Sequence, residues 1–542
     1  MKQRYNLKAL LMMTGICAGV LITSCTENFE YYNTHATNPS PNDMTVAEKV
    51  GTLFPGILYL MHNSQENDNQ MIEQMVGNQY GGYMSTTNNW QGTNFGTFNP
   101  PADWIKYPFN KLFAGFYANY LKIREITGGK GYIYAWANII RVAVMLRVTD
   151  TYGPIPYSKT GEGKLMVEYD DVQTIYHNMI DDLNNSILAL SAFVAESQGK
   201  ANPMAEYDLV YNGDFGKWVK FANSLKLRMA VRIAVVDEDY AKTIMAEAIA
   251  GGPVESNADN AFLPTTDNPY HKAAFDWGDL AVNATLSAYM NGWNDPRKNV
   301  YMTKTVDDNY RGVRMGINKI DKNIYGSNLY SKPNFAVNSP LLVYCAAETY
   351  FLKAEAALRG WIAGGEDQAK TFYEQGILIS MEQHGVSAGN YTTVTSNPQA
   401  YSDPTSNMGF NLTFNTNGGA VTVSWSSGTS TANRLEKIIT QKWLANYPLG
   451  FEAWNDFRRT NYPRIIPAVH NLSSASTGGA VNNPSSINPN STKSSTAIRM
   501  VRRLPYPVSE YDGNTANVEA AVSTLLGGPD LLSTNLWWAK KP

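Results

Sequence analysis

The spacing of hydrophobic residues predicts a chain built mainly from α-helices. The clearest example is segment 131–157, in which apolar residues recur every three to four positions, the period of a helix. Gly153 can take the left-handed C-cap conformation, and Pro154 and Pro156 cannot continue a helix. We therefore expect a long, buried helix that stops abruptly before Tyr157.

The same period predicts further helices, many of them in adjacent pairs. We expect Thr45, Asp170 and Asp214 to cap three of these helices, Asp170 through a capping box with Gln173. Paired helices with small residues at their crossings fit tetratricopeptide-like stacking, although no exact repeat period is visible. The predicted helices cover residues 45–63, 68–83, 103–126, 172–190, 214–233, 239–250, 341–361, 367–384, 432–446 and 451–459.

Long segments without a hydrophobic period interrupt the helices. Residues 252–340 are dense in Asn, Gly, Pro and Tyr, with isolated strand-like pieces such as 313–315. Residues 392–431 are rich in Ser, Thr and Asn, with a hairpin expected around 421–425, and 471–495 is of low complexity. Insertions this long with little regular structure are uncommon in a compact domain unless they have a function.

The N-terminus has the features of a lipoprotein signal. Lys2 and Arg4 precede an apolar stretch, 9–22, which is too short for an ordinary transmembrane helix. The sequence Leu-Ile-Thr-Ser-Cys at 21–25 resembles a bacterial lipobox, which implies that Cys25 is acylated and becomes the mature N-terminus. Two or three acyl chains give stable anchoring. The alternative is an ordinary secretory signal with a chance cysteine nearby.

Cysteine usage agrees with this interpretation. Of three cysteines, Cys17 leaves with the signal and Cys25 is lipidated, so Cys345 cannot pair within the chain. We expect Cys345 to be a small buried apolar residue.

The expected organisation of the chain is a signal peptide at 1–24, a tether at 25–43 and a single domain at 44–542. Within this domain we expect a helical scaffold at about 44–250 and 341–460, and loop-rich insertions at about 252–340 and 392–431.

Composition narrows the classes of function. The net charge of −3 gives no basic footprint for nucleic acid. Tyrosine outnumbers phenylalanine, 33 to 19, and there are 12 tryptophans, so many rings carry a polar group that suits a hydrated binding surface.

Several segments, in order, resemble the SusD/RagB family of outer-membrane nutrient-binding lipoproteins. Each motif alone is weak evidence for the family, but the motifs occur in the order typical of the family and together span nearly the whole mature chain. The segments are the lipobox at Cys25, the helix that runs into Tyr-Gly-Pro-Ile-Pro at 152–156, the helix 218–232, the helix 344–361, Gln-Lys-Trp at 441–443 followed by Phe-Glu-Ala-Trp-Asn-Asp-Phe-Arg-Arg-Thr at 451–460, and Arg-Leu-Pro-Tyr-Pro at 503–507 with Glu510, Asn514 and Asn517.

The resemblance implies both a fold and a function. It implies a mostly α fold, with four tetratricopeptide-type helix pairs packed against a loop-rich second half that holds a few short strands. It further implies a cell-surface, lipid-anchored protein of the outer membrane that partners a TonB-dependent (SusC-like) transporter. Such a protein binds a nutrient, a glycan first and a peptide as the alternative, and uses no cofactor.

The charged motif in segment 451–460 could be mistaken for a catalytic cluster. Opposite charges three or four positions apart on a helix pair locally, and Trp454 is expected to anchor the core. We therefore favour a structural role over a catalytic one. The residues concerned are Glu452, Trp454, Asp456, Arg458 and Arg459.

Enzyme signatures are weak. Gly-Val-Ser-Ala-Gly at 385–389 matches the G-x-S-x-G pattern, but a helix is predicted before it where a nucleophile elbow needs a strand. The six histidines are scattered without metal-ligand spacing, and no phosphate-binding loop is present. Asp181 and Asp182 fall on an ordinary helix face. We expect no enzyme and no metal site, with a surface glycoside hydrolase or a purely structural surface protein as the alternatives.

Aromatic residues in polar loops are the candidates for ligand binding, because aromatics at helical spacing are usually core. Trp90 is the best match by position to a stacking aromatic in related proteins. We leave out Asp295-Pro-Arg297, which resembles a structural turn of the family. The candidates are Tyr83, Asn88, Asn89 and Trp90 in the first polar loop, and Tyr270, Asp276, Trp277, Trp293, Tyr325 and Tyr330 in the insertion.

Overall fold

A computed structural model describes residues 44–198, 200–405, 421–428, 430–474, 479, 481 and 500–539. The predicted signal peptide and tether, with the lipid-anchor residue Cys25, lie outside the described residues and stay predictions. The chain divides into two compact units, 1–51 and 52–542. In the first unit, helix α3 (Val46–Gly51) is described. Its predicted cap is confirmed, because the Glu48 amide donates to Thr45 Oγ1 (3.3 Å) and the Thr45 amide donates to Glu48 Oε2 (2.7 Å).

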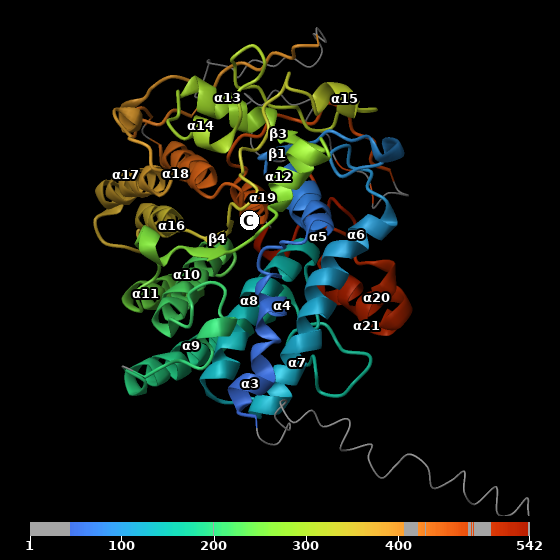
Figure 1. Ribbon diagram of the computed structural model, residues 1–542, viewed down its shortest axis with the longest axis vertical. Helices are drawn as coiled ribbons and strands as arrows, with labels where there is room; N and C mark the ends of the chain where they lie inside the picture. Colours follow the sequence, from blue (N-terminus) through green and yellow to red (C-terminus); the bar gives the residue numbers. More distant parts are fainter. Residues whose placement is uncertain are drawn as a thin grey trace, which may run out of the picture. The chain divides into compact units, whose positions relative to one another are not determined.

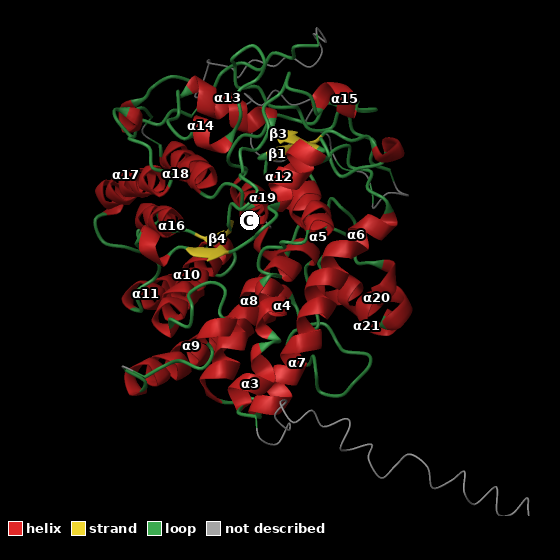
Figure 2. Cartoon of the chain, in the orientation of Figure 1, coloured by secondary structure: helices red, strands yellow, loops and turns green. Residues whose placement is uncertain are grey.

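The second unit is mostly α-helical (Figures 1 and 2). Among its described residues, no helix has both the length and the apolar character needed to cross a membrane. The longer helices are α6 (Ala102–Phe109), α7 (Gly115–Thr127), α8 (Gly131–Tyr152), α9 (Val172–Glu196), α10 (Phe215–Ile233), α11 (Glu238–Ala250), α13 (Ala284–Gly292), α16 (Ala346–Leu358), α17 (Gly365–Gln383), α18 (Thr431–Ala445) and α19 (Gly450–Thr460). The shorter ones are α4 (Phe54–Leu58), α5 (Glu66–Asn69), α12 (Pro269–His271), α14 (Lys298–Tyr301), α15 (Lys322–Tyr325), α20 (Val508–Gly513) and α21 (Thr515–Ala520).

Neighbouring helices pack against one another in a continuous stack. Helix α8 contacts α9, α9 contacts α10, and α10 contacts both α11 and α16. Helix α16 then contacts α17 and α18, which continues the stack on the left of Figure 1. This arrangement confirms the predicted tetratricopeptide-like scaffold.

The loop-rich part of the unit holds two short antiparallel sheets. Strand β1 (Met84–Thr86) pairs with β3 (Leu280–Val282), and β2 (Ala261–Leu263) pairs with β4 (Leu341–Tyr344). Loops dominate the end of the unit that carries α13, α14 and α15 (Figure 2). The insertion is therefore mostly irregular, as predicted, but it also contains α13, a short helix that the hydrophobic period did not reveal.

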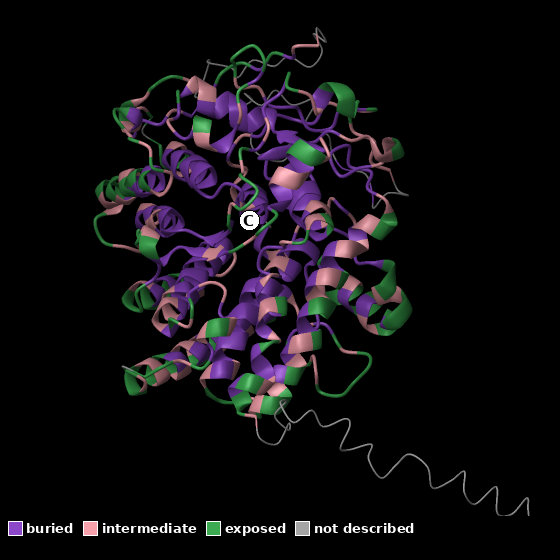
Figure 3. Cartoon of the chain, in the orientation of Figure 1, coloured by how far each residue is buried: buried purple, intermediate pink, exposed green. Residues whose placement is uncertain are grey.

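Helix α8 is buried along nearly its whole length, from Ile133 to Tyr152 (Figure 3). It ends at Tyr152 as predicted. Gly153 has a positive φ of 97°, which a side chain would disfavour, but its ψ of −133° lies outside the left-handed helical region that we expected. Cys345 is free and fully buried, as predicted.

Several predicted boundaries were wrong. The helix predicted for 45–63 is interrupted at 52–53, because Pro55 fits only the first turn of a new helix, α4. The apolar run Leu341–Tyr344 is strand β4, and helix α16 begins only at Ala346. Four consecutive buried apolar residues do not distinguish a strand from a helix. The hairpin expected near 421–425 is absent from the described residues there, and 406–420 lies outside them.

The predicted cap of α9 was displaced by one residue. Asp171 is the cap, because its Oδ1 accepts the Thr174 amide hydrogen at 2.9 Å. Asp170 instead accepts the backbone amides of Tyr157 (3.0 Å) and Ser158 (2.6 Å), so it holds the segment that leaves α8. The predicted cap of α10 is confirmed, because Asp214 Oδ1 accepts the Lys217 amide hydrogen at 3.2 Å.

Candidate ligand-binding face

The pairing of β1 with β3 brings two predicted candidate loops together. Thr86 lies opposite Leu280, and the antiparallel pairing continues beyond the strands. The Thr87 amide donates to the Asp279 carbonyl at 2.9 Å, and Thr87 Oγ1 donates to the Gly278 carbonyl at 2.6 Å. The loop that follows β1 therefore lies beside the loop that precedes β3.

Asp279 is the polar hub of this junction. Its carboxylate accepts Asn88 Nδ2 at 3.1 Å and Gln70 Nε2 at 3.3 Å. Lys322 Nζ lies 3.1 Å from the same carboxylate, so the charge of Asp279 is compensated by an exposed lysine. These contacts fix Asn88 at the edge of the sheet, with part of its surface open to solvent.

Trp90 is held in an unusual backbone conformation. Its φ is 36° and that of Gln91 is 62°, values that L-residues rarely adopt. The turn is fixed because Asn88 Oδ1 accepts the Trp90 amide hydrogen (3.2 Å) and Thr93 Oγ1 donates to the Trp90 carbonyl (3.1 Å). Residues of this kind cost about 1–3 kcal/mol each and cluster at functional sites.

The Trp90 ring forms a half-exposed aromatic corner with Trp104. Their ring centroids are 5.6 Å apart and the planes meet at 84°, an edge-to-face contact. Both side chains remain partly open to solvent, and Trp104 projects from the start of α6. Two indoles at a right angle can cover two sides of one ligand ring.

Asp276 and Trp277 lie at the end of the same loop that carries Asp279. Asp276 is exposed, whereas Trp277 is half-buried. Because the two loops lie side by side, we group their residues with the Trp104 corner as the Trp90 face, which we define as Asn88, Asn89, Trp90, Trp104, Asp276, Trp277 and Asp279.

The remaining predicted candidates are buried side chains with protein partners. Tyr83 stacks on Trp443 at 5.2 Å and donates its hydroxyl to the Trp443 carbonyl. The Tyr270 hydroxyl is 2.8 Å from His62 Nε2, and Trp293 Nε1 donates to the Ser396 carbonyl at 3.1 Å.

Tyr325 and Tyr330 are buried in a small cluster of their own. The two rings lie 5.1 Å apart, and the Tyr330 hydroxyl donates to Asp403 at 3.1 Å. Burial and the charge of Asp403 raise the pKa of Tyr330 far above its usual value, so the hydroxyl stays protonated as a donor. Because all five buried rings face protein, they are not part of the Trp90 face.

Sequence reasoning missed Trp104, Asp279, Lys322 and Gln70. Trp104 lies in a helical pattern, where an aromatic is usually core, so its position gave no signal. Asp279 becomes important only because β1 pairs with β3, and short strands far apart in sequence leave no local trace of their pairing.

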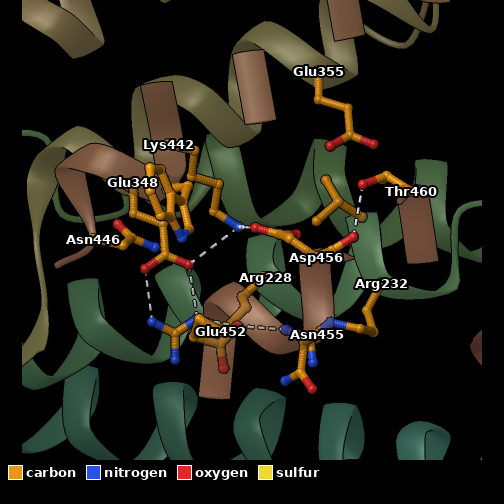
Figure 4. A network of polar contacts seen from close by, with 12 residues as sticks. Arg228, Arg232, Glu348, Glu355, Lys442, Asn446, Glu452, Asn455, Asp456 and Thr460 are labelled. Atoms are coloured by element: carbon orange, nitrogen blue, oxygen red, sulfur yellow. Dashed lines mark hydrogen bonds and ion pairs between the residues drawn. The ribbon is translucent and has the colours of Figure 1, made fainter. Parts of the chain in front are cut away.

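The charged motif of α19 is part of a buried ionic network (Figure 4). Its members are all buried, and the indole of Trp454 is fully enclosed, as predicted. Asp456 Oδ1 accepts Arg459 Nε at 2.8 Å, which confirms the expected local pairing three positions apart. Most of the other partners lie on different helices, however, which the sequence did not indicate.

The network links α19 to four other helices. Glu452 pairs with Arg232 and lies 3.5 Å from Arg228, both on α10. Arg459 forms a bidentate pair with Glu355 of α16, with both bonds 2.7 Å long. Arg228 forms a second bidentate pair with Glu348 of α16, at 2.8 and 2.7 Å. Lys442 of α18 pairs with Asp456 at 3.0 Å, and Arg232 pairs with Asp150 of α8.

Electrostatics explains how these charges can be buried. Burial opposes the ionisation of Glu355, but attraction to Arg459 and Arg359 outweighs it and lowers its pKa from 4.5 to about 2. Burial likewise opposes the ionisation of Asp456, but Lys442 and Arg459 lower its pKa to about 2. Both carboxylates are therefore charged at neutral pH, which suits a lock between helices.

The other enzyme signatures have structural explanations. Ser387 of the G-x-S-x-G match is exposed in a turn that follows α17, without a strand before it, as predicted. Asp182 accepts the Tyr157 hydroxyl (2.6 Å) and lies 3.2 Å from Arg141, so it supports the segment that leaves α8.

Comparison with known proteins identifies this architecture. A model of the SusD-like family, described as Susd and RagB outer membrane lipoprotein, matches residues 31–539. A SusD-like protein from Bacteroides thetaiotaomicron is 37% identical, with a TM-score of 0.81 over 91% of this chain and 99% of that chain. A chitin-binding SusD homologue from Flavobacterium johnsoniae is 32% identical, with a TM-score of 0.82 over the same shares. Among curated proteins, no relative matches the chain.

The stacked helix pairs, with a loop-rich half against them, therefore define a SusD-like fold. The chain belongs to the SusD-like family of nutrient-binding outer-membrane lipoproteins. This confirms the family resemblance that the order of the sequence motifs predicted.

Proposed function

We propose that this lipoprotein captures a glycan on the Trp90 face and delivers it to a TonB-dependent outer-membrane transporter. The observation that carries the proposal is the half-exposed corner of Trp90 and Trp104 beside Asn88 and Asn89. Sugar rings present C–H groups that pack on indole faces, and their hydroxyls need partners that both donate and accept hydrogen bonds. Amide side chains supply both.

A glycan fits this face better than a peptide does. An exposed sheet edge would favour a peptide, because extended peptides bind by adding a strand. Here β1 is only three residues long and all three are buried, whereas the face itself consists of indole rings, amides and two carboxylates. The similarity to a chitin-binding SusD homologue also favours a glycan, and oligosaccharides of N-acetylglucosamine are the first to test.

The proposed function is binding without catalysis. Glycosidases use two carboxyl groups across the scissile bond, one of them free to act as an acid. On the Trp90 face, Asp279 is already committed to Asn88, Gln70 and Lys322, and the second carboxylate, Asp276, lies 3.5 Å from Lys272. Calorimetric titration with oligosaccharides should therefore give a heat of binding without new reducing ends, and the release of reducing ends would contradict the proposal.

We propose that Cys25 anchors the protein in the outer membrane and that the folded part faces the cell exterior. Replacing Cys25 with serine should abolish acyl labelling and release the protein from the membrane fraction or block its processing, because serine offers no thiol for lipid attachment. Fractionation and metabolic labelling with a fatty acid measure this. Unchanged labelling would disprove the anchor.

If the protein partners a transporter as proposed, the two proteins should purify together. The native lipoprotein, purified from outer membranes in a gentle detergent, should bring a TonB-dependent transporter with it. Mass spectrometry of the purified complex identifies the partner. A matched purification of the Cys25→Ser variant controls for co-purification through shared lipid. Recovery of the lipoprotein alone, under conditions that keep other lipoprotein complexes intact, would argue against the partner.

A further inference from the structure

A second hollow opens in the loop-rich part, away from the Trp90 face. Its volume is about 150 Å³. Three segments form its walls, α13, the turn 309–311 and the segment 399–402. The lining residues are Ser287, Ala288, Asn291, Asn309, Tyr310, Arg311, Gln399, Ala400, Tyr401 and Ser402. We call it the α13 pocket.

Hydrogen bonds between the walls preform the pocket. The Gln399 amide donates to the Ala288 carbonyl at 2.8 Å, and Asn291 Nδ2 donates to the Tyr310 carbonyl at 2.7 Å. The Gly312 amide donates to Ser287 Oγ at 2.9 Å. Because each wall is tied to α13, a ligand would not have to order the loops on binding, which lowers the entropic cost of association.

A glycine allows the third wall to approach α13 so closely. A Cβ atom on Gly292 would lie 2.3 Å from the Asn397 carbonyl oxygen, which no real side chain tolerates. The close packing is reinforced by Ser396 Oγ, which donates to the Gly292 carbonyl at 2.7 Å. The close approach of this wall to α13, and with it the shape of the pocket, therefore depends on a glycine at position 292.

The size of the pocket suits a ligand ring of the size of one sugar. Ligand sites for drug-sized molecules measure roughly 300–1,000 Å³. A cavity of about 150 Å³ in another protein admits benzene, a single six-membered ring. The α13 pocket, at about 150 Å³, therefore matches a single ring.

The chemistry of the lining favours an uncharged ligand rich in hydroxyls. Arg311 is the one charged residue in the lining, and its guanidinium is held by Asp307 at 2.8 Å and by the Leu329 carbonyl at 3.1 Å. The rest of the polar lining consists of carboxamides and hydroxyls. Gln399 and Ser402 are exposed, so their polar groups can meet a ligand.

The pocket and the Trp90 face lie on opposite edges of β3. On one edge, β3 pairs with β1, which leads into Trp90. On the other, the Val282 amide donates to the Ser331 carbonyl (2.9 Å), and the Ser331 amide in turn donates to the Arg311 carbonyl (2.7 Å). A ligand in the pocket therefore does not touch the Trp90 face.

We propose that the α13 pocket is a second carbohydrate site, which holds a single neutral sugar ring independently of the Trp90 face. This goes beyond the proposed function, because binding at the pocket does not require that the Trp90 face bind a glycan.

The test uses the Trp90→Ala variant as background, so that the first face cannot contribute. Saturation-transfer NMR with glucose, galactose, mannose and N-acetylglucosamine should detect binding of at least one sugar. Adding Ala400→Trp, which fills the pocket from an exposed position without removing a hydrogen bond, should weaken that binding by tenfold or more. The matched control is Ala195→Trp on α9, an exposed alanine far from the pocket in the sequence, which should leave binding unchanged.

Two further measurements keep the test decisive. Gln399→Ala removes one lining amide but keeps the backbone hydrogen bond, so it should also weaken sugar binding. It replaces Ala400→Trp in the test if thermal melting shows that Ala400→Trp has not folded. Glucuronate should bind no better than glucose, because Asp307 already neutralises Arg311. No detectable monosaccharide binding, binding that survives both pocket variants, or a preference for glucuronate would overturn the proposal.

Discussion

Replacing Glu355 with alanine should destabilise the protein by about 3–5 kcal/mol, which is the usual effect of removing one partner of a buried ion pair. The reason is that Arg459 keeps its charge in the interior but loses two hydrogen bonds of 2.7 Å each. Chemical denaturation of the purified protein measures the change. Because the network joins helices of the scaffold, we expect a lower midpoint in one cooperative transition.

The same network predicts the response to acid. The pKa of Glu355 is lowered from 4.5 to about 2 in the folded protein, so its contribution to stability is complete above about pH 4.5. That contribution is lost as the pH falls through about 2. The stability of the Glu355→Gln variant should therefore depend less on pH between about 4.5 and 2 than that of the wild type.

A solvent-exposed ion pair is the matched control. Lys304 and Asp308 lie four positions apart, and both side chains are exposed. Such pairs contribute little in water, so Lys304→Ala should leave the denaturation midpoint nearly unchanged. If Glu355→Ala proved as mild as Lys304→Ala, the network would not be the lock between helices that its geometry indicates.

Replacing Trp90 with alanine should weaken glycan binding at least tenfold while leaving the melting temperature nearly unchanged. An aromatic hot spot loses about 2 kcal/mol or more on truncation, and 1.4 kcal/mol corresponds to a factor of ten. The fold should survive because the Trp90 side chain is half-exposed and the ring that it contacts edge to face, Trp104, is half-exposed as well. Calorimetry with the best-binding oligosaccharide measures the affinity.

Trp361→Ala provides the control for Trp90. Trp361 is also half-exposed, but it lies at the end of α16 and donates its indole N–H to Glu238 at 3.2 Å. Its removal should not affect glycan affinity. Wild-type affinity in Trp90→Ala, or unfolding of that variant, would show that Trp90 is not the stacking surface.

Local features of the sequence were enough to predict much of the scaffold. The helical period located α8 and α10 because apolar residues recur in each at the spacing of a helix, although both helices are buried on nearly every side. Asp214 marked the start of α10 through a hydrogen bond to a residue three positions away. Trp90 was predicted as a ligand contact for a similar local reason, since an aromatic residue in a polar loop without a period has no obvious place in the core, and its role in binding stays a prediction.

Other features were decided only by the tertiary structure. The hydrogen bond between Asn88 and Asp279 joins residues 191 positions apart, and it depends on two strands of three residues whose pairing leaves no pattern in either segment. Tyr83 and Trp293 were predicted to be loop aromatics, but both are buried. The burial of a side chain depends on which other segments of the chain pack over it. The charges of α19 suggested pairs along one helix, whereas Arg459 reaches Glu355 across 104 positions because the stacked helices bring the two together in the interior.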